Sequence, residues 1–338
     1  MKVEVAPKAT YAAFRASSPP FSAKIITMKY FAFALAMVSL LAGTALAAPL
    51  SSSARTVIPS AIQQIISVDY RELRNSPTAQ ALKDRVMPDT LKQFEAALRS
   101  TGIDPDKDAE QLTFVSYRNA KGALQSIGIA QGPFKQKEFL QKARLKKIKP
   151  EKYLLTYIYP MASGLSMAFL DPTTIVFGDT TAMHGAIEVR DSGADSVEKN
   201  PQINGLVTDV EPSPVWSVLD QLGTQYMMRS ALGQAASVTD YDVVKKRLLA
   251  SDYTMNFENG VTFDLNVKTS DSLTAASLAS LVKAGVVYRR MSGSPTEKVA
   301  LEDTTVDSTH DMVQMHFKTD DQRFQALLKS DLFAAVAH

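Results

Sequence analysis

Aspartates at positions 104, 106 and 108 are the first residues whose spacing could do chemistry, because alternating carboxylates can begin a calcium-binding loop. Such a loop also needs glycine at its sixth position and a bidentate glutamate at its twelfth. Those positions hold Ala109 and Val115. We therefore interpret Asp104–Asp108 as a turn that leads into a strand beginning near Leu112.

Other templates for catalysis or metal binding are missing from the sequence. It lacks G-x-S-x-G, a phosphate loop, G-x-G-x-x-G and any cysteine. His310 and His316 lie six residues apart, about 20 Å along a strand, which is too far to share a metal ion. We expect no cofactor, no metal and no identifiable catalytic residue. Acids near a hairpin turn are interpreted as solvated side chains: Glu302, Asp303, Asp307 and Asp311.

Basic residues gather in one segment, Lys135–Lys152, which holds eight cations and two acids and so carries a net charge of +6. One interpretation is contact with an anionic surface such as lipid headgroups or envelope polysaccharide. The other is a solvated helix whose cationic end complements its own dipole. The candidate contact residues are Lys142, Arg144, Lys146, Lys147 and Lys149.

The single tryptophan, Trp216, lies in an apolar run that we interpret as a strand. We expect its ring in the core, with the indole nitrogen bonded to a neighbouring carbonyl. Stacking on a ligand is the alternative.

Helical segments before the sheet are expected at residues 78–86 and from Asp89 to Gly102, separated by Pro88, which stops the first helix. Further along, Leu112–Arg118 and Ala123–Ala130 predict a hairpin, followed by a helix over residues 134–145. Strands are then expected at residues 153–159, 164–170 and 173–178, and a helix from Asp179.

Strict alternation of apolar and polar residues marks the later part of the chain. Two such runs surround Asn259-Gly260, a residue pair that favours a tight hairpin turn. Asp271 is expected to cap the following helix, and Asp320 to begin the last one after strands at residues 299–306 and 312–318. This pattern predicts an α+β fold of antiparallel sheets with helices on one face and suggests repeated strand-strand-helix units.

An export signal is predicted near the N-terminus. Lys29 precedes an apolar run of about a dozen residues, and Ala45-Leu46-Ala47 offers a cleavage site. The run is shorter than the roughly 20 residues that a membrane span needs. Without residues 1–47, 32 basic and 34 acidic residues remain, so the net charge of +2 becomes −2 and gives no reason to expect nucleic-acid binding.

The expected organisation has five parts. Residues 1–27 are an extension of the gene prediction upstream of a start at Met28, residues 28–47 are the signal peptide, and residues 48–56 are a polar linker. Two α+β regions follow at 57–235 and 236–338. After cleavage we expect a periplasmic or secreted protein that does not span a membrane.

Two stretches resemble a loose group of uncharacterised bacterial exported proteins. They are Gly102–Asp108 and the strand-Gly-Asp-helix step at Thr174–Asp179 that leads into Ala182–Ile187. Together they cover under a tenth of the chain. The resemblance implies an exported, repeated α+β architecture and no known activity.

Three functions remain open from the sequence. The first is a non-enzymatic binding or structural component of the cell envelope. The second is a carrier of an apolar ligand such as lipid, and the third is a hydrolase with an unrecognised active site.

Overall fold

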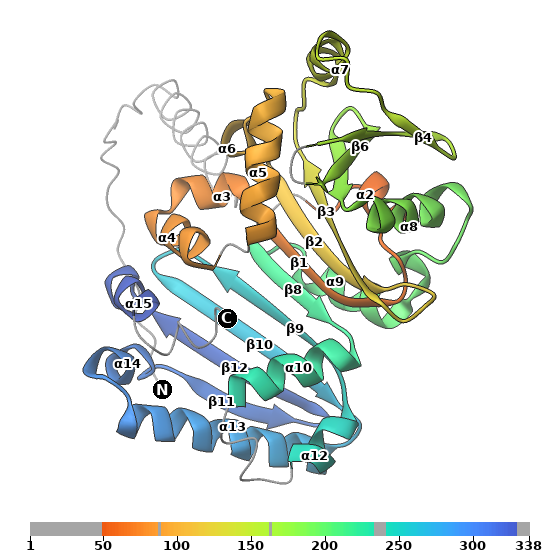
Figure 1. Cartoon of the computed structure of the whole chain (residues 1–338). Helices are drawn as coiled ribbons and strands as arrows, with labels where there is room; N and C mark the ends of the chain where they lie inside the picture. Colours follow the sequence, from red (N-terminus) through yellow and green to blue (C-terminus); the bar gives the residue numbers. More distant parts are fainter. Residues whose placement is uncertain (1–48, 87–88, 162–163, 233–240, 330–338) are drawn as a thin grey trace, which may run out of the picture. The chain divides into compact units, whose positions relative to one another are not determined.

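The chain folds around one antiparallel sheet, seen in the computed structural model of Figure 1. The structure describes residues 49–86, 89–161, 164–232 and 241–329, which belong to one compact unit. The predicted signal peptide (28–47) and upstream extension (1–27) lie outside the described residues. The α+β antiparallel class expected from the sequence is confirmed.

Twelve strands form the sheet in the order β11-β12-β10-β9-β8-β1-β2-β3-β7-β6-β5-β4. Their bounds are β1 Ile62–Asp69, β2 Gln111–Arg118, β3 Leu124–Gln131, β4 Glu151–Tyr153, β5 Thr156–Pro160, β6 Ser166–Asp171, β7 Thr174–Gly178, β8 Val215–Leu219, β9 Leu248–Asn256, β10 Val261–Thr269, β11 Thr305–Thr309 and β12 Met312–Thr319. Because β8 pairs with β9, the sheet is continuous across the boundary expected at residues 235 and 236.

The helices occupy the connections between strands. Their bounds are α2 Ser52–Thr56, α3 Tyr70–Asn75, α4 Pro77–Val86, α5 Asp89–Thr101, α6 Pro105–Asp108, α7 Gln136–Leu145, α8 Thr180–Asp191, α9 Pro201–Val210, α10 Gln221–Leu232, α12 Tyr241–Val244, α13 Ser272–Ser292, α14 Pro295–Ala300 and α15 Asp321–Leu328, with 3₁₀ turns η2 Val197–Lys199 and η3 Lys245–Arg247.

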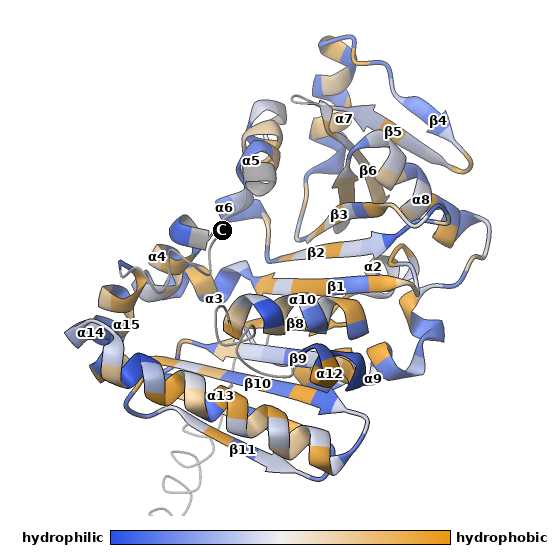
Figure 2. Ribbon diagram, turned by 60° about the horizontal axis from the view of Figure 1, so that its bottom comes forward, coloured by the Kyte–Doolittle hydropathy of each residue, from blue (hydrophilic) through white to orange (hydrophobic). Residues whose placement is uncertain are grey.

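Helices cover both faces of the sheet around β1, β2, β3 and β7. Val115 and Ile127 face a core formed with α2, α8 and α9, whereas Leu112 and Phe177 face a core formed with α3, α5 and α7. Figure 2 shows hydrophobic residues along the central strand β1. The expectation of helices on one face therefore does not hold for this part of the sheet.

The β9–β12 part matches the one-sided expectation. Leu265 and Val313 pack beneath α10 and α13, and Phe317 packs beneath α14 and α15. The opposite face of β12 exposes Gln314 and His316. The Asn259-Gly260 turn is confirmed, with φ of 56° and 105°, and the units β9-β10-α13 and β11-β12-α15 follow the expected strand-strand-helix order.

Two expectations were wrong for segments outside the candidate site. The segment expected as a polar linker forms α2, because Leu50 and Ala54 are buried in the core and Ser51 caps the helix. The strand expected at residues 299–306 begins only at Thr305, because Ser294 and Glu297 form a capping box that starts α14.

Candidate functional site

The predicted basic segment forms α7 and the chain that follows it. Two residues of α7, Phe139 and Ala143, are buried. Phe139 packs edge-on against Tyr159 of β5 and Phe169 of β6, with ring centroids 5.4 and 5.3 Å apart. The five candidate residues from Lys142 to Lys149 are all exposed.

The C-terminus of α7 is a Schellman motif with an unusual residue in it. Lys147 donates its backbone N–H to Arg144 O at 3.0 Å, and Ile148 donates to Ala143 O at 2.9 Å. This pattern requires a left-handed residue between them, and Lys147 has φ of 55°. A residue with a Cβ is less stable than glycine in that conformation.

The same motif ends α5, with glycine in the left-handed position. Gly102 donates to Arg99 O at 3.0 Å, and Ile103 donates to Leu98 O at 3.1 Å. The φ of Gly102 is 87°. The chain thus holds two equivalent helix ends, and only the α7 end has a cation, Lys147, where glycine is favoured.

Two of the five candidate residues, both lysines, contact the end of α5 instead of extending into solvent alone. Lys146 Nζ donates to Ser100 O at 2.9 Å. The Lys142 ammonium lies where a Cβ on Gly102 would be. Cations favour a helix C-terminus because its carbonyl groups carry partial negative charge. The alternative from the sequence, a cationic end that complements the dipole of its own helix, fits Lys142 and Arg144 in the last turn of α7. Lys142 and Lys146 also meet the C-terminus of α5.

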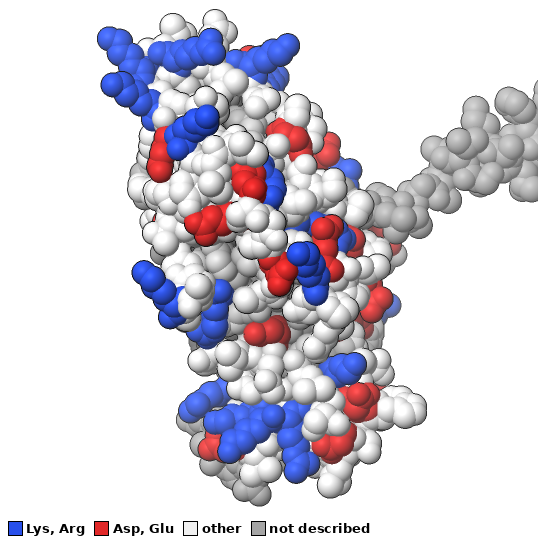
Figure 3. All heavy atoms as spheres, turned by 90° about the vertical axis from the view of Figure 1, so that its right-hand side faces the viewer, with Lys and Arg blue, Asp and Glu red and all other residues white. Residues whose placement is uncertain are grey.

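The remaining basic residues extend outward. Arg144, Lys147, Lys149 and Lys152 are exposed, and none forms an ion pair with another residue of the described ranges. We call these four residues the basic end. Figure 3 shows Lys and Arg side chains gathered at the end of the molecule where Figure 1 places α7.

The segment after the basic end differs from the single strand expected at residues 153–159. It is a hairpin, in which Tyr153 of β4 pairs with Thr156 of β5, so the two-residue turn between them is Leu154-Leu155. Leu154 has φ of 50°. We call this pair the leucine turn. Because two leucines resemble a strand interior, the sequence does not predict the reversal of the chain between them.

The leucines do not pack into the core. Leu155 is 80% exposed and Leu154 is 47% exposed. The backbone behind them is held in place, because Leu155 N and Thr156 Oγ1 each donate to Asp191 Oδ2 at 3.2 Å. Asp191 in turn accepts from Arg190 Nε at 2.8 Å, so its negative charge is compensated.

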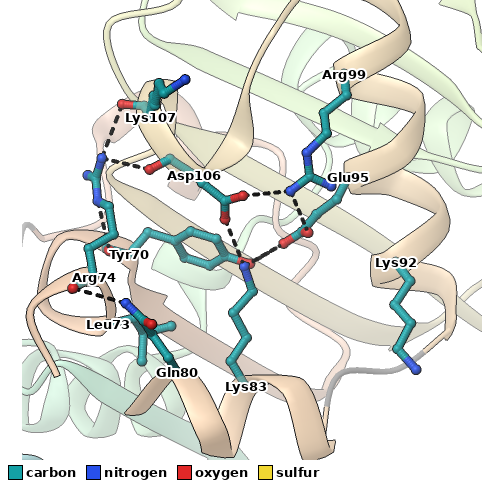
Figure 4. A pocket seen from close by; sticks show the side chains of 10 residues that line it. All are labelled: Tyr70, Leu73, Arg74, Gln80, Lys83, Lys92, Glu95, Arg99, Asp106 and Lys107. Atoms are coloured by element: carbon teal, nitrogen blue, oxygen red, sulfur yellow. Dashed lines mark hydrogen bonds and ion pairs between the residues drawn. The ribbon is translucent and has the colours of Figure 1, made fainter. Parts of the chain in front are cut away.

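A pocket of about 660 Å³ lies among α3, α4, α5 and α6 (Figure 4), and no motif in the sequence predicts it. Its charged lining residues are Arg74, Lys83, Lys92, Arg99, Lys107, Glu95 and Asp106. Lys83 Nζ bonds Glu95 Oε1 at 2.9 Å and Asp106 Oδ1 at 3.1 Å. Arg99 bonds the same two carboxylates, at 3.3 and 2.6 Å.

A buried tyrosine completes this network. Tyr70 Oη donates to Glu95 Oε1 at 2.9 Å, and Lys83 Nζ lies 4.5 Å from the centre of its ring. Burial and the Glu95 carboxylate raise the pKa of Tyr70. Burial alone would raise the pKa of Asp106, but the hydrogen bonds from Arg99 and Lys83 outweigh it and lower that pKa. The arrangement joins four helices and keeps both carboxylates engaged with cations.

Asp104–Asp108 is the turn that the sequence predicted. Asp104 accepts from Asp106 N at 3.3 Å as the N-cap of α6, and its own N–H donates to Asp108 Oδ2 at 2.7 Å. Because the Asp106 carboxylate faces Arg99 and Lys83, the three carboxylates do not converge on one point. Within the described ranges, no group of three or more acids and histidines is placed to hold a metal ion.

The two strand histidines lie apart, as expected. His310 is at the turn between β11 and β12, with φ of 54°. His316 Nδ1 lies 2.6 Å from Asp264 Oδ1 on the exposed face of the sheet.

Trp216 lies in the core, where its side chain is 1% exposed and packs with residues of α9 such as Ile203 and Val207. The expected hydrogen bond of its indole is not formed: Nε1 is buried and has no partner among the described residues. In the ladder Trp216 stands opposite Ser67 of β1 and Thr254 of β9.

Among the described helices, none is both long enough and apolar enough to span a membrane. No protein-family model and no curated protein sequence matches the chain. Three solved structures of TP0453 are similar to it. Crystal form I has a TM-score of 0.48 at 10% identity and covers 85% of this chain and 98% of that one. Crystal form III has a TM-score of 0.46 at 11% identity and covers 83% and 97%.

Proposed function

We propose that the chain is an exported, non-enzymatic protein of the cell envelope that binds an anionic surface through the basic end. The observation that carries the proposal is Lys147 in the left-handed position of a motif whose second copy uses Gly102. The dipole of α7 favours a cation at this helix end, but it does not require one in the position where glycine is most stable, and this supports a use of the charge outside the fold. The exposure of Arg144, Lys149 and Lys152 beside it supports the same use.

The structure narrows the set of residues proposed for contact. Lys142 and Lys146 contact the end of α5, so their replacement is expected to weaken the packing of α7 as well as any binding. Arg144, Lys147 and Lys149 remain as contact residues from the sequence, and Lys152 joins them.

The test measures binding to anionic vesicles and retention on dextran sulfate by a variant with glutamine at all four residues of the basic end. Each cation near an anionic surface contributes about 1 kcal/mol, so the loss of four is expected to weaken binding at least 100-fold at low salt. The matched control replaces four exposed lysines in other parts of the chain by glutamine: Lys121, Lys246, Lys298 and Lys318. Equal retention of the fourfold variant and the control would contradict the proposal.

The predicted signal peptide supports the export part of the proposal. N-terminal sequencing of the product recovered outside the cytoplasm is expected to begin at Ala48. A product that retains Lys29 and the apolar run after it would contradict cleavage.

A further inference from the structure

The leucine turn is built against the preferences of its position. Two-residue hairpin turns favour Asn, Gly and Asp, since these residues adopt positive φ most readily. Here Leu154 has that φ, and its neighbour Leu155 is 80% exposed. Neither local conformation nor packing in the fold explains a leucine at either position.

The turn is presented at the end of a supported hairpin. Tyr153 stacks on His184 of α8 and donates to Glu188, and Ile158 of β5 is buried. These contacts, with those of Asp191, hold β4 and β5 in place. The leucines therefore project from an anchored element.

The hairpin and the basic end share one side of the sheet. Lys152 stands opposite Tyr157 in the ladder, and Tyr157 is 54% exposed. Tyr159, two residues further on the same face, packs against Phe139 of α7. Arg144 lies in the last turn of α7, and its positive charge opposes the rise that burial causes in the pKa of Tyr159. Leu145, at the end of α7, is 75% exposed.

Cations, an interfacial tyrosine and projecting leucines form the combination that binds an anionic lipid bilayer. The cations attract the headgroups, and the apolar side chains enter the boundary of the acyl chains. A polysaccharide offers no comparable apolar layer for the leucines.

We propose that the leucine turn inserts into the surface of an anionic lipid bilayer on which the basic end docks. This inference rests on the proposed function, because it names the partner that the basic end binds.

The experiment compares two probes. One is vesicles of phosphatidylglycerol and phosphatidylcholine, measured by co-sedimentation, and the other is dextran sulfate, a soluble polyanion without an apolar layer, measured by retention on a column. The test variant is Leu154→Asn with Leu155→Ser, because asparagine suits the turn and keeps the hairpin folded. The control is Leu273→Ser, which removes a leucine that is 72% exposed at the start of α13.

The leucine variant is expected to bind vesicles at least tenfold more weakly and to keep its retention on dextran sulfate, whereas the control changes neither. Unchanged vesicle binding by the leucine variant would overturn the inference and leave the proposed function intact. If the fourfold glutamine variant of the basic end bound both vesicles and dextran sulfate as strongly as the wild type does, that result would instead contradict the proposed function.

A second measurement reports insertion directly. Trp216 is the only tryptophan, so Leu155→Trp in a Trp216→Phe background gives one reporter in the turn. Addition of anionic vesicles is expected to shift its emission to shorter wavelength, as the indole leaves water. An emission maximum that stays fixed while the protein binds vesicles would refute insertion.

Discussion

Replacement of Lys147 by glycine separates the cost of this residue to the fold from its use in binding. A left-handed residue with a Cβ costs about 1–2 kcal/mol. Glycine in turn lowers the stability of the fold by about 0.4–1 kcal/mol, because it gives the unfolded chain more conformational freedom. The φ of 55° at Lys147 therefore predicts a net gain in the free energy of unfolding of about 0.5–1 kcal/mol. For a chain of this size the melting temperature is expected to rise by about 1–3 °C.

The same substitution is expected to weaken binding. Loss of one cation near an anionic surface costs about 1 kcal/mol, which is about a fivefold change in affinity. Calorimetric melting gives the first quantity, and co-sedimentation with anionic vesicles at low salt gives the second. Higher stability with lower affinity is the combined result that the structure predicts for Lys147→Gly.

Lys147→Gln is the matched control, because it removes the charge and keeps a Cβ in the left-handed position. It is expected to lose affinity to the same degree as the glycine variant and to have the melting temperature of the wild type. Two results would refute this reasoning separately. A glycine variant without a higher melting temperature would contradict the Schellman geometry, and unchanged affinity would remove Lys147 from the binding surface.

Three further outcomes are expected. Gly102→Ala should lower the melting temperature, because alanine would have to adopt the left-handed φ of 87° that Gly102 has, and thermal melting checks this. Glu95→Gln should destabilise the fold by roughly 1–2 kcal/mol in denaturant unfolding, because it removes one of the two carboxylates that pair with Lys83 and Arg99, while Asp106 keeps its ion pairs with both. The Asp271 side chain caps α13, and hydrogen bonds from the Ser270 hydroxyl and from the backbone and side chain of Thr274 lower its pKa to about 2 from 3.8. Since its carboxylate stabilises the fold above the unfolded pKa, the advantage of wild type over Asp271→Asn should shrink as pH falls from about 4 to about 2 in a series of melts.

Local signals predicted much of the fold. Asp179, Asp271 and Asp320 each cap the helix expected after them, and the Asn259-Gly260 turn lies between the strands expected around it. These features depend on a few neighbouring residues, so they can be predicted from the sequence without knowledge of the tertiary structure. The single continuous sheet depends on long-range pairing such as that of β8 with β9, which no local pattern reveals.

The sequence predicts only part of the candidate site, because the rest depends on contacts between residues far apart in the chain. The charge of the Lys135–Lys152 segment is visible in the sequence, but the contacts of Lys146 with the end of α5 arise from tertiary packing. Leu154-Leu155 was read as strand interior because hydrophobicity normally indicates burial. A turn of exposed leucines violates that rule, which agrees with the contact proposed above for this turn.

The strand order also sets a distance. The leucine turn leaves the sheet at one edge, beside β4, and β11 forms the other edge. Eleven steps of about 4.8 Å between neighbouring strands place the two edges up to roughly 50 Å apart. A protein that lies against a bilayer by its β4 edge would hold β11 and α13 at the far end of this span. The sheet then acts as a spacer, and a partner that binds the β11 edge would do so outside the headgroup layer.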